Sequence, residues 1–135
     1  MRLTKCDTEL IQAYSVLWQS SPYCCQYHDK SKCDEHYMNG NCPSDYLKLS
    51  EEERNRIYDW IDGAFELDEE YICPDTSYGL KHIYEHATKK YVTNGQFKGA
   101  MIHYGYEPVN PRDLNCNYRV RIDDEVLMKY MGVKR

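Results

Sequence analysis

Apolar side chains recur every three or four residues in five segments of the chain, which is the spacing of an amphipathic helix. The stripes are Leu10 to Trp18, Ile57 to Phe65, Leu80 to Ala87, Phe97 to Tyr104 and Val126 to Met131. We therefore predict five helices. Asp7 is the candidate N-cap of the first helix, and Asp123 or Asp124 starts the last one.

Start and stop signals define two of these helices more sharply. Ser50 and Glu53 have the spacing of a capping box, and so do Thr93 and Gln96. Gly105 follows the fourth stripe at the position where a helix commonly ends in a left-handed residue. The second and fourth helices are therefore predicted to begin directly after Ser50 and Thr93.

Apolar and polar residues alternate between Cys116 and Ile122, which predicts a half-buried strand. Tyr71–Pro74 reads as a short extended piece that follows an acidic connector, Glu66–Glu70. Together the elements predict an α+β fold that is helix-rich and has a small antiparallel sheet and an N-terminal Cys/His zinc-binding loop.

We expect one compact domain with two regions. Residues 1–70 form a helical acidic region that contains the Cys/His loop, residues 22–46. Residues 71–135 form an α+β region in which two neighbouring helices resemble a helix-turn-helix pair.

The aliphatic content is low for a chain of 135 residues. Val, Ile, Leu and Phe supply 24 residues together, whereas Tyr alone supplies 14. Tyrosine rings carry large buriable area, and metal ligands can compensate for a small core. Neither a membrane span nor a secretory signal is expected, because no apolar run is long enough and the N-terminus has no apolar stretch. Without export, seven cysteines indicate reduced thiols or metal ligands.

The densest chemical signal is CCQYHDKSKCDEHYMNGNC, residues 24–42. Thiolates and imidazoles at such short spacings are the side chains that bind zinc tetrahedrally. Six residues compete for four places, so the ligand set stays open. The preferred ligands are Cys25, His28, Cys33 and Cys42, and the substitutes are Cys24 and His36. A zinc ion held by four side chains would be structural, since no coordination position stays open for chemistry.

A second motif, residues 82–86, reads H-x-x-E-H, the pattern of one class of zinc peptidases. On a helix, His82 and His86 point away from the apolar face. Only 49 residues follow His86, which leaves little chain for a third ligand and a substrate cleft. Two exposed histidines are therefore the favoured interpretation, and the protein is expected not to be an enzyme.

Charge is distributed unevenly along the chain. Residues 1–75 have a net charge of −9, and residues 76–135 have a net charge of +4. A negative surface rich in tyrosine suits a basic channel on another protein. The expected partner-binding residues are two dense acidic runs, Glu51, Glu52 and Glu53 together with Asp68, Glu69 and Glu70.

The alternative is a regulatory protein that binds DNA through residues 77–121. Its second helix, 94–104, would enter a groove with Gln96, Lys98, Gly99, Ile102 and His103 facing outward. Basic residues of the same region would contact phosphates. They are Lys81, Lys89, Lys90, Lys98, Arg112, Arg119 and Arg121.

Residues 76–122 resemble a family of small proteins encoded by phages and mobile elements of bacteria. The shared pattern is SYGLKH at 77–82, YVTNGQFKGAM at 91–101, Gly-Tyr at 105–106 and Asn-Tyr at 117–118. The resemblance implies a mobile-element accessory protein that acts in the cytoplasm of a bacterial host.

In size, acidity and Cys/His cluster the whole chain is also similar to some type II anti-CRISPR proteins. This similarity implies a zinc-stabilised, phage-encoded inhibitor that binds a bacterial defence nuclease and blocks its engagement of nucleic acid.

Overall fold

The computed structural model describes residues 2–19 and 40–134. All five predicted helices are present, and so is a small antiparallel sheet, which confirms the helix-rich α+β class. In chain order the elements are α1 (Lys5–Gln19), the 3-10 helix η1 (Pro43–Lys48), α3 (Glu51–Ala64), β1 (Phe65–Leu67), α4 (Ser77–Thr88), α5 (Asn94–Tyr104), β2 (Val120–Ile122) and α6 (Asp124–Lys134).

Both predicted capping boxes are formed, at the starts of α3 and α5. Gly105 ends α5 with a φ of 113°, in the left-handed region, as predicted. The prediction that Asp7 caps α1 is wrong by three residues. Thr4 is the cap, because its Oγ1 accepts from Asp7 N at 3.1 Å while Asp7 Oδ2 accepts from Thr4 N at 2.9 Å.

The sheet consists of two short antiparallel strands in which Phe65 pairs with Ile122 and Leu67 pairs with Val120. We predicted that Glu66–Glu70 form a connector. That prediction is wrong for Glu66 and Leu67, which belong to β1. These residues extend because their partner strand, far away in sequence, supplies the hydrogen bonds.

The predicted C-terminal strand is shorter than expected. Cys116 and Tyr118 precede β2, and their carbonyl oxygens accept from Ser77 N at 2.7 Å and from Cys73 N at 2.9 Å. Tyr118 also forms an isolated bridge with Pro108. These bonds connect the start of α4 to the sheet.

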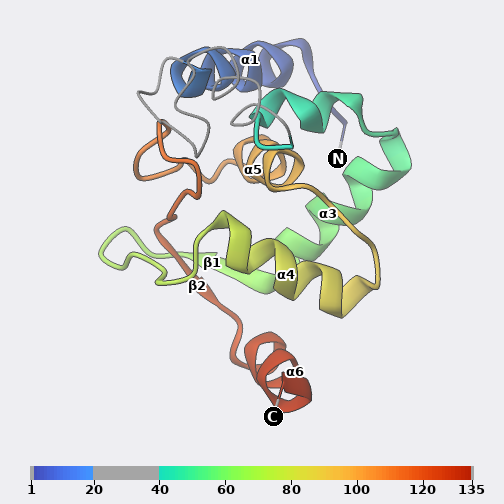
Figure 1. The fold of residues 1–135 in the computed structure, drawn as a ribbon, viewed down its shortest axis with the longest axis vertical. Helices are drawn as coiled ribbons and strands as arrows, with labels where there is room; N and C mark the ends of the chain where they lie inside the picture. The colour runs from blue at the N-terminus through green and yellow to red at the C-terminus, as the bar shows by residue number, and fades with distance from the viewer. Residues whose placement is uncertain (1, 20–39, 135) are drawn as a thin grey trace, which may run out of the picture.

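Helix α5 lies at the centre of the fold, in contact with α1, η1, α3 and α4 (Figure 1). Every residue of α5 except Gln96 and Tyr104 is buried. Gly95 and Gly99 allow this position, because a Cβ on Gly99 would lie 2.3 Å from Tyr46 Cβ and one on Gly95 would lie 2.4 Å from Cys42 O. The backbone of α5 therefore packs directly on residues 41–46.

This central position overturns the prediction of a DNA-reading helix. The predicted outward residues Lys98, Gly99, Ile102 and His103 are all buried. A helix packed on four neighbours has no face left for a groove. The sequence pattern suggested an exposed face because lysine and histidine are ordinarily polar surface residues.

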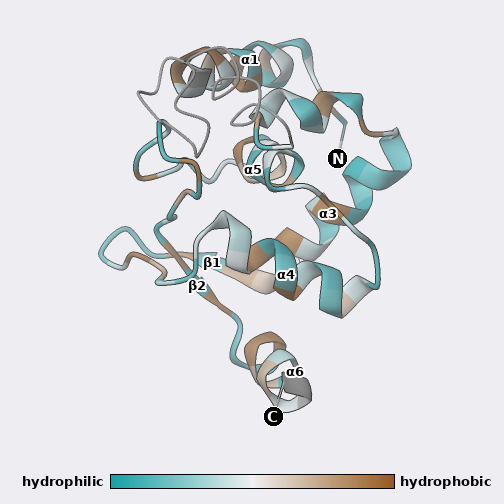
Figure 2. Ribbon diagram, viewed as in Figure 1, coloured by the Kyte–Doolittle hydropathy of each residue, from teal (hydrophilic) through white to brown (hydrophobic). Residues whose placement is uncertain are grey.

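Aromatic rings supply much of the core, as the composition predicted. The ring of Trp60 contacts the rings of Phe65, Tyr84 and Phe97 at centroid distances of 5.5, 5.3 and 6.4 Å. The hydrophilic start of α3 gives way to apolar residues where the helix approaches α4 (Figure 2). Within the described residues, no helix is long and apolar enough to cross a membrane.

Candidate functional site

Of the six candidate zinc ligands, Cys42 is the one that lies within the described residues. It is buried directly before η1, and its Sγ lies 3.1 Å from Ser44 Oγ. Trp18, at the end of α1, forms a small core cluster with Cys42 against Leu114. The other candidates lie outside the described residues. They are Cys24, Cys25, His28, Cys33 and His36.

The chain directly after residues 20–39 is attached near the start of α5, and Trp18, just before them, packs against Cys42. Gly40 O accepts from Gly95 N at 2.9 Å, and Asn41 Oδ1 accepts from Asn94 Nδ2 at 3.0 Å. Because the fold already holds these ends together, gathering ligands between them costs less loop-closure entropy. Within the described ranges no three Cys, His, Asp or Glu side chains converge as a metal site.

A buried lysine lies beside Cys42. Lys98 is 2% exposed; its Nζ donates to Leu114 O at 3.1 Å and lies 4.5 Å from the centroid of the Trp18 ring. Burial lowers the pKa of Lys98 to about 8, against the opposing effect of the Cys116 and Cys42 thiols. A lysine ammonium beside Cys42 would compensate for the negative charge of a metal-bound thiolate.

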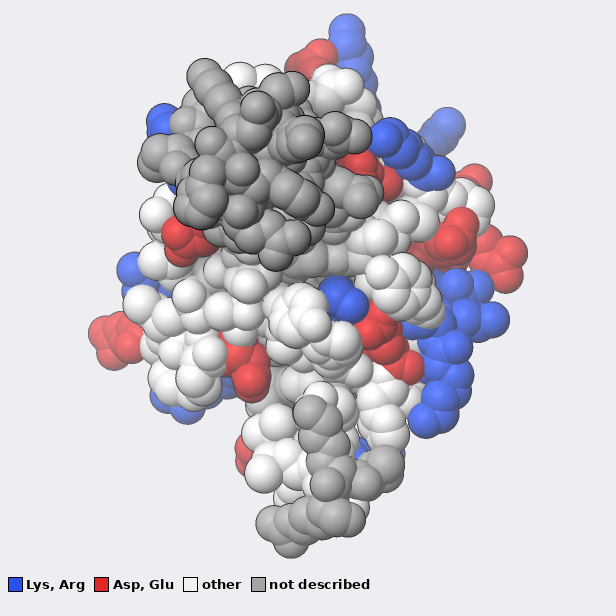
Figure 3. All heavy atoms as spheres, viewed as in Figure 1, with Lys and Arg blue, Asp and Glu red and all other residues white. Residues whose placement is uncertain are grey.

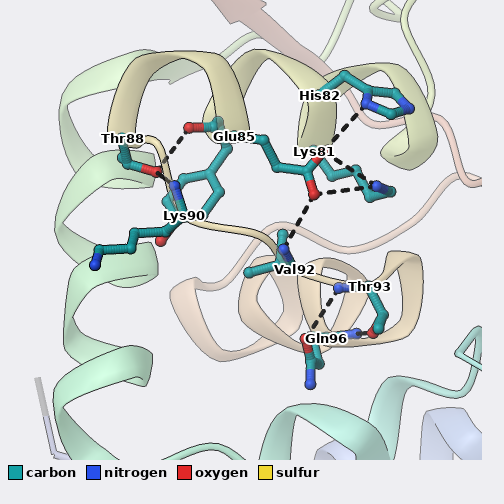
Figure 4. A network of polar contacts seen from close by, with 9 residues as sticks. Lys81, His82, Glu85, Thr88, Lys90, Val92, Thr93 and Gln96 are labelled. Atoms are coloured by element: carbon teal, nitrogen blue, oxygen red, sulfur yellow. Dashed lines mark hydrogen bonds and ion pairs between the residues drawn. The ribbon is translucent and has the colours of Figure 1, made fainter.

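The H-x-x-E-H motif on α4 does not form a catalytic arrangement. Glu85 accepts from Lys81 Nζ at 3.3 Å and from Val92 N at 3.1 Å, and His82 Nδ1 lies 3.1 Å from its Oε1 (Figure 4). His86 instead packs against the ring of Tyr130 on α6, at a centroid distance of 5.6 Å. The Glu85 carboxylate therefore links α4 to the connector between α4 and α5.

A buried polar chain joins three elements around His103. Its Nδ1 lies 2.6 Å from the hydroxyl of Tyr46, and its Nε2 lies 3.6 Å from Asp7 Oδ2. Burial lowers the pKa of His103, while Asp7 acts in the opposite direction. The arrangement ties α1 and η1 to α5.

The first acidic run, Glu51–Glu53, lies at the start of α3 and partly serves the helix itself. Glu53 Oε1 accepts from Ser50 N at 3.2 Å, and Glu52 lies 3.6 Å from Arg56 Nη2. This run is separated from the second by the whole of α3, a length of about 20 Å at 1.5 Å per residue. The two predicted binding runs are therefore distinct sites.

The second acidic run, Asp68–Glu70, follows β1 and lies next to a pocket. Asp68 Oδ2 accepts from Arg121 Nε at 2.6 Å, and Glu69 O accepts from Arg119 Nη1 at 3.4 Å. The Arg121 guanidinium lies 4.0 Å from the centroid of the Tyr71 ring. Arg121 holds the pKa of Asp68 below its ordinary value by a hydrogen bond. Both arginines therefore donate hydrogen bonds to residues of the turn that follows β1.

The pocket has a volume of about 410 Å³, and four of its ten lining residues are acidic. Its carboxylates come from Glu66, Asp75, Asp123 and Asp124, and Tyr71 and Arg121 complete one wall. With the neighbouring turn they form what we call the acidic face: Glu66, Asp68, Glu69, Glu70, Asp75, Asp123 and Asp124.

Cys73 also lines the pocket but is 1% exposed, and burial raises the pKa of its thiol. It is therefore a neutral packed thiol rather than a nucleophile. Asp123 also caps α6, because its Oδ1 accepts from Glu125 N and Val126 N. The face can attract a cationic surface.

The pocket could not be predicted from the sequence, because Glu66, Asp75 and Asp124 come from three separate segments. For Lys98 a local signal existed. It stands between Phe97 and Gly99, in a helix whose apolar residues and glycines leave little polar face.

Comparison of the chain with models of protein families, with curated proteins and with solved structures finds no match.

Proposed function

We propose that this protein is a non-enzymatic inhibitor that binds a basic, nucleic-acid-binding surface of a bacterial defence nuclease. The observation that carries the proposal is the acidic face, where four carboxylates line a pocket, three more lie on the neighbouring turn, and the nearby Arg119 and Arg121 are already engaged. A concentrated negative field accelerates association with a positive surface and repels nucleic acid.

The preferred target class is the RNA-guided nuclease of a type II CRISPR system. This part rests on the sequence, namely the resemblance of residues 76–122 to phage proteins and the acidity and Cys/His cluster of the chain. Such a nuclease holds its nucleic acids in a positively charged channel, which is the chemistry that an acidic face complements.

The test of this function is a DNA-cleavage assay with purified type II nucleases and the full-length protein. The wild type is expected to inhibit cleavage by at least one nuclease. The matching variant carries Glu66→Gln, Glu69→Gln, Glu70→Gln and Asp124→Asn, all exposed positions without a capping role. It is expected to inhibit at least tenfold less well, since like losses at charged interfaces amount to about 1.4 kcal/mol or more.

A control variant, Glu51→Gln with Glu52→Gln, removes exposed carboxylates from the far end of α3. It is expected to inhibit more strongly than the acidic-face variant. Equal inhibition by the wild type and the acidic-face variant would overturn the electrostatic mechanism.

We also propose that a structural zinc ion is bound by residues of segment 22–46. The support is the ligand density of the sequence and the position of Cys42, buried beside an ammonium where the segment returns to the core. Zinc would be held by Cys42 with three of the remaining candidates, and its part is to stabilise that segment.

Elemental analysis of the purified protein tests the zinc proposal. We expect about one zinc per chain in the wild type and none in Cys33→Ser or Cys42→Ser, together with lower thermal stability. Cys73→Ser makes the same chemical change at a buried position near the sheet and is expected to keep the metal. A metal-free wild type, or zinc retained by both ligand variants, contradicts the proposal.

A further inference from the structure

Two exposed tyrosine rings flank a buried ammonium on the surface of α4 and of the connector after it. Tyr78 is 52% exposed and Tyr91 is 77% exposed, whereas Lys81 is only 5% exposed. Lys81 Nζ lies 5.4 Å from the centroid of the Tyr78 ring and 5.2 Å from that of the Tyr91 ring. The two rings are thus close together, and each presents apolar surface to water.

The network around Glu85 holds these rings in place. Its carboxylate binds Lys81 on α4 and the backbone N–H of Val92, the residue after Tyr91 (Figure 4). The ring of His82 packs edge-on against Tyr78 at a centroid distance of 4.5 Å. The charge of Lys81 is balanced by Glu85, so this lysine supports the rings. The tyrosines therefore form a preorganised platform.

Two lysines stand at the end of α4, directly before Tyr91 in the chain. Lys89 and Lys90 are exposed, and Lys90 N donates to Thr88 Oγ1 at 3.3 Å. Figure 3 shows Lys and Arg atoms gathered along the edge where α4 ends.

We infer that this surface binds single-stranded nucleic acid. Bases stack on Tyr78 and Tyr91, while Lys89 and Lys90 neutralise phosphates. Exposed aromatic rings beside cations are the combination that binds single strands without sequence preference. A duplex keeps its bases stacked inside and offers the rings nothing. The surface shares no residue with the acidic face, so the inference does not rest on the proposed function.

Fluorescence anisotropy with a labelled oligothymidylate of about 15 nucleotides, at about 50 mM salt, tests the inference. We expect binding to the single strand and at least fivefold weaker binding to a duplex of the same length. Tyr78→Ala with Tyr91→Ala is expected to weaken binding at least fivefold, whereas the double phenylalanine variant keeps the rings and binds like the wild type.

Charge variants complete the test. Two phosphate contacts give a slope of about −1.4 for log K against log salt, and Lys89→Gln with Lys90→Gln is expected to bring the slope close to zero. Lys5→Gln with Lys48→Gln removes the same charge from α1 and η1 and is expected to leave binding unchanged. No binding to the single strand, equal binding to the duplex, or no loss in the double alanine variant would overturn the inference.

Discussion

Helix α5 and the acidic face are built in contrasting ways. Around α5, side chains and backbone are in direct contact, and Gly99 packs against η1 without room for a methyl group. At the acidic face, β1 and β2 pair through three residues each, and exposed carboxylates lie at and beside a pocket. We infer that packing at α5 fixes the fold, whereas residues of the acidic face can change in charge without disturbing it.

Adding one methyl group to α5 is the most severe test of its close packing. Gly99→Ala would place a Cβ 2.3 Å from Tyr46 Cβ and 2.4 Å from Pro43 O, so helix and η1 must move apart. We expect a loss of about 3 kcal/mol or more in the free energy of unfolding, at the upper end of overpacking. Urea denaturation measures it.

The matched control for that variant is Gly63→Ala on α3, where a Cβ meets nothing within 4 Å. Alanine should stabilise this helix by up to about 1 kcal/mol. If Gly99→Ala is as stable as the wild type, backbone packing of α5 does not fix the fold.

The second prediction concerns His103, whose pKa is lowered by burial. The unfolded chain then binds a proton that the folded chain does not, so stability is fully present above the ordinary histidine pKa and is lost as the pH falls below it. His103→Leu also leaves the Tyr46 hydroxyl without its partner, at a cost of about 1–3 kcal/mol.

Urea denaturation at about pH 7.5 and about pH 5.5, one unit on either side of the ordinary histidine pKa, tests this pair of effects. The wild type should lose stability towards the lower pH, and the loss should be smaller in His103→Leu. The groups facing the ring are Asp7, Tyr46, Tyr58 and Arg54. An identical loss in both proteins would show that His103 does not carry the pH dependence.

The smallest effect is expected at the exposed pair of Asp68 and Arg121. Asp68→Asn removes a charged hydrogen bond that water partly replaces, so thermal stability should fall only slightly. The difference from the wild type should shrink further in high salt, because salt screens exposed charges. A large, salt-independent loss would mean that the acidic face supports the fold as α5 does.

Local signals predicted much of the fold. The capping boxes at Ser50 and Thr93 and the stop at Gly105 depend on residues within one helical turn, and all three are confirmed. The burial of α5 depends on segments far away in sequence, and so does the pairing of Glu66 with Arg121 in the sheet. These long-range contacts were not predictable from periodicity.

The candidate site divides in the same way. The acidic run Asp68–Glu70 was visible in the sequence, but the pocket beside it arises only when Asp75 and Asp124 are brought together by the fold. Glu53 was predicted to bind a partner, yet its carboxylate caps α3. A local count of charges does not distinguish a carboxylate that serves a helix from one that is free to bind.

Binding of the acidic face to a basic surface of a defence nuclease is best tested by calorimetric titration of the protein into a type II RNA-guided nuclease, at low and high salt. We expect saturable binding that weakens with salt. For the variant neutralised at Glu66, Glu69, Glu70 and Asp124 we expect weaker binding with a flatter salt dependence. Binding that is equally tight and equally salt-dependent in wild type and variant would contradict it.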